Sequence, residues 1–404
     1  MEVKPGYKQT ELGVIPEGWD VRKLPDLSWF QEGPGLRNWQ FTASGMKVIN
    51  VTNLENGVLN LDRTDRHISL DEFNRTYRHF EVEDADIVMA SSGNSYSKTA
   101  IVRPQDLPLV MNTSVIRFRP AKGCDYGFLW ALLNSPQFKQ QIDLMITGGA
   151  QPNFGPYHLK RICVPFPPLP EQRAIAEALS DVDGLLGGLD RLIAKKRDLK
   201  QAAMQQLLTG QTRLPGFHGE WEVKQLGRVL RFQVGFPFSS AFFNEKGQGI
   251  RLIKNRDLKC DDQVFYYSGA YDSAYLVKDG DVLVGMDGDF LPCLWSKGTA
   301  LLNQRVGRIV PTVGLNLQFV YYYLLEPLKE IEIATASTTV KHLSHGDIES
   351  IEQPLPSLPE QTAIAEGLTA MDAELTALEQ RREKTRALKQ AMMQELLTGR
   401  TRLV

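Results

Sequence analysis

The sequence has few cysteines and no long hydrophobic run. Only four of its 404 residues are cysteine, and no two of them form a CxxC pair, which argues against a zinc ribbon and a disulfide-linked scaffold. No apolar stretch approaches the ~18 residues that span a bilayer. The first residues, MEVKPGYKQTELG, hold no apolar signal core. We therefore expect a cytoplasmic protein that makes no contact with membranes.

The sequence also lacks a large excess of either positive or negative charge. The chain has 46 Lys and Arg against 48 Asp and Glu, which gives a formal net charge of −2. Free-standing nucleic-acid binders usually carry a basic excess, so a nucleic-acid role must rest on local basic faces or on a partner. Apolar residues make up 42% and charged residues 23%, so the composition predicts an ordinary folded protein.

Enzyme motifs are missing as well. The chain contains no GxGxxG, HExxH or GxSxG. Gly93–Thr99 resembles a phosphate loop but is one residue short and lacks the second glycine. Asn153–Tyr157 lacks the adjacent prolines of the Asn-Pro-Pro-Tyr element of amino-methyltransferases. We predict no catalytic residue in this chain.

Two polar pairs have a structural and a functional interpretation. His342 and His345 have the spacing of a metal pair, but the first half of the chain has no counterpart, which favours a surface or core role. Paired acids occur in both halves, as Asp84 with Asp86 and as Asp279 with Asp281. Such acids could serve a nuclease, yet the pattern favours a polar turn that enters a strand. We therefore predict no metal site.

What the chain does contain is a copy of part of itself. Leu169–Leu214 and Leu358–Leu403 align without a gap and are identical at 27 of 46 positions. The segments before them, each roughly 150 residues long, match only in outline. A protein that binds two copies of one partner and two different targets would have this pattern. Duplication followed by drift is the other interpretation.

The near-identical segments predict two long helices. Pro170 and Glu171 suit a first turn, and Gly210 and Gly399 suit the residue after a helix end. Residues 170–208 would form a helix of about 58 Å. Such a helix has no core of its own, so we expect the two to pack as an antiparallel pair. A four-three spacing of apolar residues marks the expected seam, which also serves partner docking: Ile175, Leu179, Val182, Leu186, Leu189 and Ile193, then Ile364, Leu368, Met371, Leu375 and Leu378. In the second helix the seam is interrupted at Arg382 and Thr385 and resumes at Leu388.

The divergent segments predict mixed domains. Short strands are expected at Ile87–Ala90, Val115–Phe118, Val282–Val284 and Val306–Ile309. Helices are expected at Tyr126–Met145 and Leu317–Glu332, interrupted by Pro136 and Pro327. The fold class is therefore α+β.

Several loops carry amide, hydroxyl and cationic donors, which are the groups that contact base edges and phosphates. Composition alone favours the alternative that they are only solvated loops. The candidate DNA-binding residues are Arg37, Asn38, Asn94, Tyr96, Lys98, Gln151 and Asn153 in the first half, and Ser239, Ser240, Lys254, Arg256, Thr338, Thr339 and Lys341 in the second.

The full pattern resembles the specificity subunit of type I restriction–modification systems, the HsdS family. The motifs that carry the resemblance are Thr10–Trp19, Pro-Leu-Pro-Glu-Gln at Pro168–Gln172, its repeat at Leu358–Gln361, and Leu-Leu-Thr-Gly at Leu207–Gly210 and Leu396–Gly399. The resemblance covers the whole chain.

The resemblance implies two similar target recognition domains joined by a pair of long antiparallel coiled-coil helices, with a pseudo-twofold internal repeat. The implied boundaries are 1–167 and 215–357 for the recognition domains, and 168–214 and 358–404 for the helical regions. Each domain would read one half of a split sequence in double-stranded DNA, and the helices would set the spacing.

The resemblance also implies the partners. The helices would dock two methyltransferase subunits, and restriction/translocase subunits would join them. AdoMet, ATP and Mg²⁺ would belong to these partners, with no cofactor in this chain. The alternative is a coiled-coil scaffold with two duplicated globular modules and no DNA role.

Overall fold

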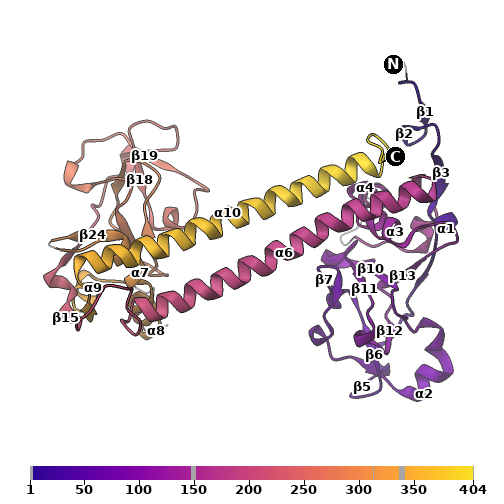
Figure 1. Cartoon of the computed structure of the whole chain (residues 1–404), viewed down its shortest axis with the longest axis horizontal. Coiled ribbons are helices and arrows are strands. Elements are labelled where there is room, and N and C mark those ends of the chain that lie inside the picture. Colours follow the sequence, from indigo (N-terminus) through magenta and orange to yellow (C-terminus); the bar gives the residue numbers. More distant parts are fainter. Residues whose placement is uncertain (1–2, 147–151, 313, 336–341, 404) are drawn as a thin grey trace. The chain divides into compact units, whose positions relative to one another are not determined.

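The computed structural model describes residues 3–146, 152–312, 314–335 and 342–403. They fall into two compact units, the first made of residues 1–190 with 380–404 and the second of residues 191–379. Each unit therefore contains one divergent segment and a part of both near-identical segments. In Figure 1 the sheets of the first unit are indigo to purple and those of the second are orange.

The first unit is built on two four-stranded sheets. One has the order β11-β10-β13-β4, and the other has the order β12-β6-β9-β5. Their strands are β4 (Ser28–Glu32), β10 (Ile87–Ala90), β11 (Thr99–Ile101) and β13 (Val115–Pro120), then β5 (Phe41–Thr42), β6 (Met46–Ile49), β9 (His67–Ile68) and β12 (Leu109–Met111). The smaller elements are β1 (Tyr7–Thr10), β2 (Gly13–Pro16), β3 (Asp20–Lys23), α1 (Leu24–Leu27), β7 (Leu54–Glu55), β8 (Val58–Leu59), α2 (Leu70–Glu72), α3 (Tyr126–Leu133), α4 (Pro136–Met145), α5 (Pro156–Leu159) and β14 (Cys163–Phe166).

The second unit repeats this framework. Its sheets have the orders β16-β24-β21-β22 and β17-β19-β18-β23-β20, so the strand order of the first unit recurs with one strand added. The strands are β16 (Leu230–Val234), β21 (Val282–Gly285), β22 (Pro292–Leu294) and β24 (Val306–Pro311), then β17 (Phe243–Asn244), β18 (Ile250–Ile253), β19 (Phe265–Tyr267), β20 (Leu276–Val277) and β23 (Ala300–Leu302). The other elements are β15 (Glu222–Gln225), α7 (Leu317–Tyr323), α8 (Leu325–Ala334), α9 (His345–Glu349) and β25 (Glu352–Leu355).

The expected α+β fold is confirmed, and proline explains one of the two helix breaks. Pro136 is the first residue of α4, where a missing N–H costs nothing, and the Ser135 hydroxyl accepts a hydrogen bond from the Phe138 N–H. In the second unit the break falls at Leu324, between α7 and α8, and Pro327 lies inside the first turn of α8.

The two long helices are α6 (Leu169–Leu207) and α10 (Leu358–Leu396), of 39 residues each. Within the first unit, Asp183 pairs with Lys389 and Asp190 with Arg382. Within the second unit, Lys196 pairs with Glu374 and Lys200 with Asp372. In both units a step forward along α6 is a step backward along α10, so the helices pair antiparallel (Figure 1).

The helix ends also complete the domain cores. In the first unit, Ile175 and Leu179 of α6 and Met393 and Leu396 of α10 join the cluster around Trp19 and Phe128. In the second unit the roles are exchanged. There Ile364 and Leu368 of α10 are buried with Phe319, while Met204 and Leu207 of α6 pack against them. Part of the predicted seam therefore packs against a globular domain as well as against the other helix.

One detail of the predicted seam is wrong. Thr385, expected to interrupt the seam, is buried, whereas Leu388, expected to resume it, is 55% exposed. The Thr385 hydroxyl donates to the Arg381 carbonyl of its own helix, which satisfies the polar group and lets the residue occupy a buried position.

Among the described residues, no helix is both long and apolar enough to cross a membrane. The same residues contain no group of three or more His, Cys, Asp or Glu side chains arranged to hold a metal ion.

Candidate nucleic-acid interface

The repeated Pro-Glu-Gln motif fixes each globular domain to its helix. The Gln172 side chain donates to the carbonyl of Pro167 at 2.9 Å and accepts from the Asp125 N–H at 2.8 Å, at the N-cap of α3. Gln361 does the same for Pro356 at 3.0 Å and for Asn316 at 2.9 Å, at the N-cap of α7. Both glutamines are fully buried. In each domain, the buried glutamine thus holds the start of the long helix against the N-terminus of a domain helix.

Two polar loops lie side by side in the first domain. The Phe154 N–H donates to the Ser91 carbonyl at 3.0 Å, and the Gly93 N–H donates to the Pro152 carbonyl at 3.1 Å. The side chains of Asn94 and Asn153 are exposed on these adjoining loops. The sequence proposed both as candidates, and the structure brings their loops together.

The second domain has the same junction with different residues. Asp287 and His342 form a backbone bridge where the first domain has Ser92 and Asn153. The Asp287 carboxylate also contacts His342 Nδ1 at 3.0 Å and Arg305 at 3.2 Å. His342, weighed above as a metal ligand, is instead in hydrogen-bond contact with an acid. The framework is shared, and the groups that it presents differ.

Tyr96 is engaged inside its own domain. Its hydroxyl donates to Asp143 at 2.6 Å and accepts from Lys139, whose ammonium lies 4.3 Å from the ring centroid. The Tyr96 hydrogen bond, followed by the one from Lys139, lowers the pKa of Asp143. Lys98, by contrast, is exposed. Of these two candidates, only Lys98 has an exposed side chain outside such a network.

Lys254 is similarly engaged in the second domain. Its ammonium lies 3.1 Å from the centroid of the Phe265 ring, and burial together with the nearby Arg256 lowers its pKa. Arg256 donates to the carbonyl and the side chain of Gln263, at 3.1 and 2.8 Å. Ser239 and Ser240 are exposed. Gln151, Thr338, Thr339 and Lys341 lie outside the described residues.

The paired acids behave as turn residues. Asp86 is 1% exposed, and its carboxylate accepts from Arg119 and from the Glu83 N–H at 2.8 Å. This hydrogen bond from Arg119 raises the pKa of the guanidinium. In the second domain, Asp281 accepts from the Lys278 N–H at 2.9 Å. The interpretation as a polar turn is therefore confirmed for both inner acids.

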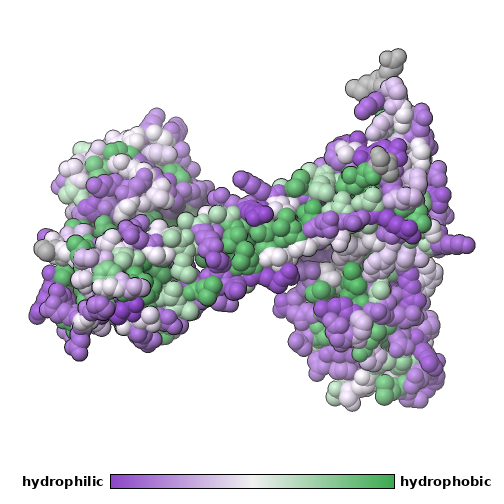
Figure 2. All heavy atoms as spheres, in the orientation of Figure 1, coloured by the Kyte–Doolittle hydropathy of each residue, from purple (hydrophilic) through white to green (hydrophobic). Residues whose placement is uncertain are grey.

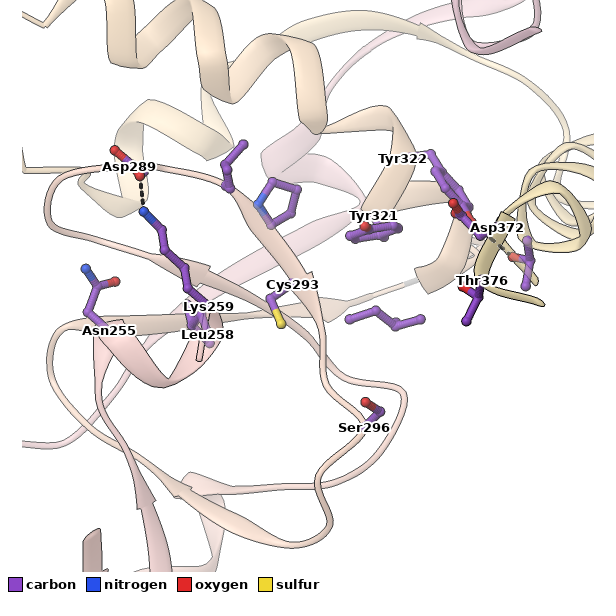
Figure 3. A pocket seen from close by; sticks show the side chains of 14 residues that line it. Asn255, Leu258, Lys259, Asp289, Cys293, Ser296, Tyr321, Tyr322, Asp372 and Thr376 are labelled. Atoms are coloured by element: carbon purple, nitrogen blue, oxygen red, sulfur yellow. Dashed lines mark hydrogen bonds and ion pairs between the residues drawn. The ribbon is translucent and has the colours of Figure 1, made fainter. Parts of the chain in front are cut away.

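A surface cavity of about 620 Å³ lies in the second unit, between its globular domain and α10 (Figure 3). Its wall includes the Lys259–Asp289 ion pair and Tyr322, whose hydroxyl donates to Asp372 at 2.7 Å. Burial raises the pKa of Tyr322 above its ordinary value. The polar groups named here already have partners. Cys293 adds a thiol to the wall, and burial raises its pKa.

Sequence reasoning missed one exposed side chain beside two of its candidates. Arg37 and Asn38 are exposed on a short turn (Asn38–Gln40), and Trp39 between them and Gln40 is 81% exposed. The available signal was a tryptophan inside a Gly- and Pro-containing polar segment, where no apolar pattern requires it.

Comparison with known proteins identifies the framework. Residues 16–193 and 218–387 each match the family model described as "Type I restriction modification DNA specificity domain". The putative type I restriction enzyme MjaX specificity subunit of Methanocaldococcus jannaschii is 26% identical over 98% of this chain and 97% of its own length. The type I restriction enzyme EcoBI specificity subunit of Escherichia coli is 37% identical over 46% of this chain and 40% of its own length.

Solved structures share the fold. A chain from a study of complex assembly and conformational transition in a type I R-M system superposes with a TM-score of 0.63 at 18% identity, covering 96% of this chain and 99% of its own. The type I restriction–modification S subunit of M. genitalium gives a TM-score of 0.57 at 16% identity, covering 98% of both chains.

Proposed function

We propose, from the premise that the chain belongs to the family of type I restriction–modification DNA specificity domains, that its two recognition domains read the two halves of a split double-stranded DNA target. The chain is a specificity subunit of such a complex and not its catalytic component. It acts together with DNA and with the other subunits of the system. The finer division of labour below is our proposal.

One observation carries the proposal. The same strand order, the same buried glutamine and the same antiparallel helix contacts occur in both units, while the loops at matching places carry different polar groups. A shared framework with different loops is the arrangement expected of two domains that recognise different short sequences. Contacts to the bases determine the sequence that is bound, and the framework holds the contacting loops in position.

The helix pair would set the spacing between the half-sites. Each recognition domain is packed against the start of one long helix and the end of the other. A change in the length of the helices should therefore move both domains, because each is packed against helix ends. Inserting one helical turn, about 5.4 Å, into both α6 and α10 would lengthen the gap in the target by about one or two base pairs, given a rise of ~3.4 Å per base pair.

The nearly identical helices would also dock two methyltransferase subunits, with restriction/translocase subunits joining that core. AdoMet, ATP and Mg²⁺ would then be bound by these partners in the cytoplasm. Support comes from the repeat itself, because 27 of 46 aligned positions are identical. Two equal surfaces suit two copies of one partner.

Methylome sequencing of cells that express this chain with its methyltransferase tests the proposal. We expect a bipartite methylated motif, a changed half after exchange of residues 215–357 for those of a relative, and a longer gap after the double helix insertion. A motif in which both halves change after the exchange, or an unchanged gap, would contradict modular reading. The purified chain alone should neither methylate nor cut DNA.

The second candidate, a coiled-coil scaffold without a DNA role, is separated by a binding assay. The complex with the methyltransferase should bind its target with a strong dependence on salt and should discriminate against a scrambled duplex. A scaffold would show neither property.

A further inference from the structure

Trp39 is the most exposed of the large hydrophobic side chains among the described residues, at 81%. An indole ring so exposed gains nothing from the core of its own domain. Leu36, three residues earlier, is buried with Met46 and Val48 in a core cluster. The segment is therefore attached to the domain, and only its tip projects.

The turn that carries Trp39 is braced on both sides. The Arg37 N–H donates to the Gln40 side chain at 2.7 Å, and the Gln40 N–H donates to the Arg37 carbonyl at 2.9 Å. The Gln40 amide in turn donates to the Tyr77 hydroxyl at 2.9 Å and to Glu72. A ring held on such a turn has already lost much of the freedom that it would otherwise lose on binding.

Three arginines belong to this turn or to segments that it contacts, and among the described residues none of them forms an ion pair. Arg37 precedes the turn. Arg66 lies over the Phe41 ring at 5.0 Å, directly after the turn. Arg78 follows Tyr77, to which Gln40 is bonded. All three are exposed. A flat apolar ring among unpaired cations is complementary to a nucleic acid, which offers phosphates beside stacked bases and sugars.

The second domain lacks this ring at the matching place. Gly33 and Gly235 start the two segments, and a Cβ on either would lie 2.2 Å from a backbone carbonyl oxygen, of Asn112 or Asn303. Counted from these glycines, Ala241 stands at the place of Trp39. The matching turn (Ser240–Phe242) has an aromatic ring one place later, Phe242, which is 49% exposed and lies against the Tyr267 ring at 5.9 Å between centroids. Among the described residues, an indole exposed as fully as Trp39 therefore occurs in the first domain only.

We propose that Trp39 makes an apolar contact with the DNA of the half-site read by the first domain, with Arg37, Arg66 and Arg78 binding the phosphates around it. This rests on the proposed DNA-reading function and adds a residue to it. At one half-site the indole adds affinity that does not depend on the release of counterions from the DNA. The second half-site is read without an indole at this place.

Binding of the complex with its methyltransferase to three duplexes tests the proposal: the target, the target with its first half scrambled, and the target with its second half scrambled. Which half belongs to the first domain follows from the exchange of residues 215–357. We expect Trp39→Ala to weaken target binding about tenfold and Trp39→Phe to retain most of it. The slope of the logarithm of the binding constant against the logarithm of the salt concentration should stay unchanged in Trp39→Ala. In Arg37→Ala this slope should become shallower by about 1.

Val58→Ala serves as the control, because Val58 is a 41% exposed apolar side chain elsewhere in the same domain and should leave affinity unchanged. Loss of DNA-induced quenching of tryptophan fluorescence in Trp39→Phe, with binding retained, reports the contact directly. If the wild-type complex does not distinguish the target from the scrambled duplexes, the proposed function fails. If it does and Trp39→Ala binds like wild type, or loses the methyltransferase instead, the contact proposed here is wrong.

Discussion

The Glu171 carboxylate, in the first turn of α6, accepts hydrogen bonds from the guanidinium of Arg402, which follows the end of α10, at 2.9 and 2.8 Å. It also accepts from the Trp19 indole at 2.8 Å and is 1% exposed. The second unit repeats this arrangement, with Glu360 bound to Arg213 at 2.6 Å and to Trp221 at 3.2 Å. The start of each long helix is therefore tied to the end of the other and to the entry of its recognition domain.

Arg402→Ala should loosen this junction in the first unit. It leaves a buried carboxylate with only the indole as a side-chain partner, so we expect a loss of about 2 kcal/mol in the free energy of local opening. Hydrogen exchange of the first turn of α6 measures this. Arg400→Ala is the control, because Arg400 lies at the exposed surface, 3.7 Å from Glu395, and should cost less than about 0.5 kcal/mol. Equal effects of the two substitutions would mean that the contact between Glu171 and Arg402 does not stabilise the start of α6.

The charges along the helices favour the antiparallel arrangement. On the facing surfaces each helix has acids in its first part and bases in its second. In α6 these are Asp183 and Asp190, then Lys196, Arg197 and Lys200; in α10 they are Asp372, Glu374 and Glu379, then Arg382 and Lys389. A parallel pair would bring like charges together.

A charge swap in the first unit tests this polarity. Asp183→Lys places two cations opposite each other at Lys389 and should destabilise the unit, and adding Lys389→Asp should restore most of the loss. We expect a coupling of about 0.5–1 kcal/mol, smaller in high salt, because both side chains are partly exposed. A double-mutant cycle by urea unfolding gives this value. Additive single effects would show that these charges do not select the orientation.

Much of the frame could be predicted from the sequence because its signals are local. Apolar spacing and end signals located both long helices, and β10 was expected at the bounds that it has, Ile87–Ala90. The repeat predicted two similar domains, as the common strand order confirms. The domain boundaries drawn from the resemblance stay predictions.

Contacts between distant segments could not be read in this way. The pairing of Glu171 with Arg402 joins residues 231 positions apart. The burial of Thr385 depends on which side of α10 faces the other helix, and a threonine carries no apolar signal for it. Tyr96 in a polar loop suggested a DNA contact, yet its hydroxyl binds Asp143 from another element. All of the DNA-binding candidates therefore remain untested predictions.

Gly399 and Gly210 end the two helices with the same motif but in different surroundings. Both have positive φ, +72° and +71°, so alanine at either is strained by about 1 kcal/mol. A Cβ at Gly399 would also lie 2.4 Å from Pro16, whereas a Cβ at Gly210 would lie 3.3 Å from Trp221. We expect Gly399→Ala to cost about 1–3 kcal/mol more than Gly210→Ala in chemical unfolding. Equal costs would indicate that the segment around Pro16 moves freely.

Tyr96→Phe separates a structural role of this side chain from DNA contact. Its hydrogen bond is the main reason that the pKa of Asp143 is lowered, with Lys139 second. A lowered carboxyl pKa stabilises the fold above the ordinary value of about 3.9, and this stability is lost as the pH falls through the lowered pKa.

Tyr96→Phe should therefore unfold at lower urea than wild type at pH 7, and the difference should shrink as the pH falls below about 4. Urea unfolding between pH 3 and 7 measures the trend. Asp143→Asn should remove the pH dependence without removing the tyrosine. Because the Tyr96 hydroxyl is already bonded within its domain, DNA affinity of the assembled complex should change less than twofold. A tenfold loss of affinity with unchanged stability would instead return Tyr96 to the DNA interface.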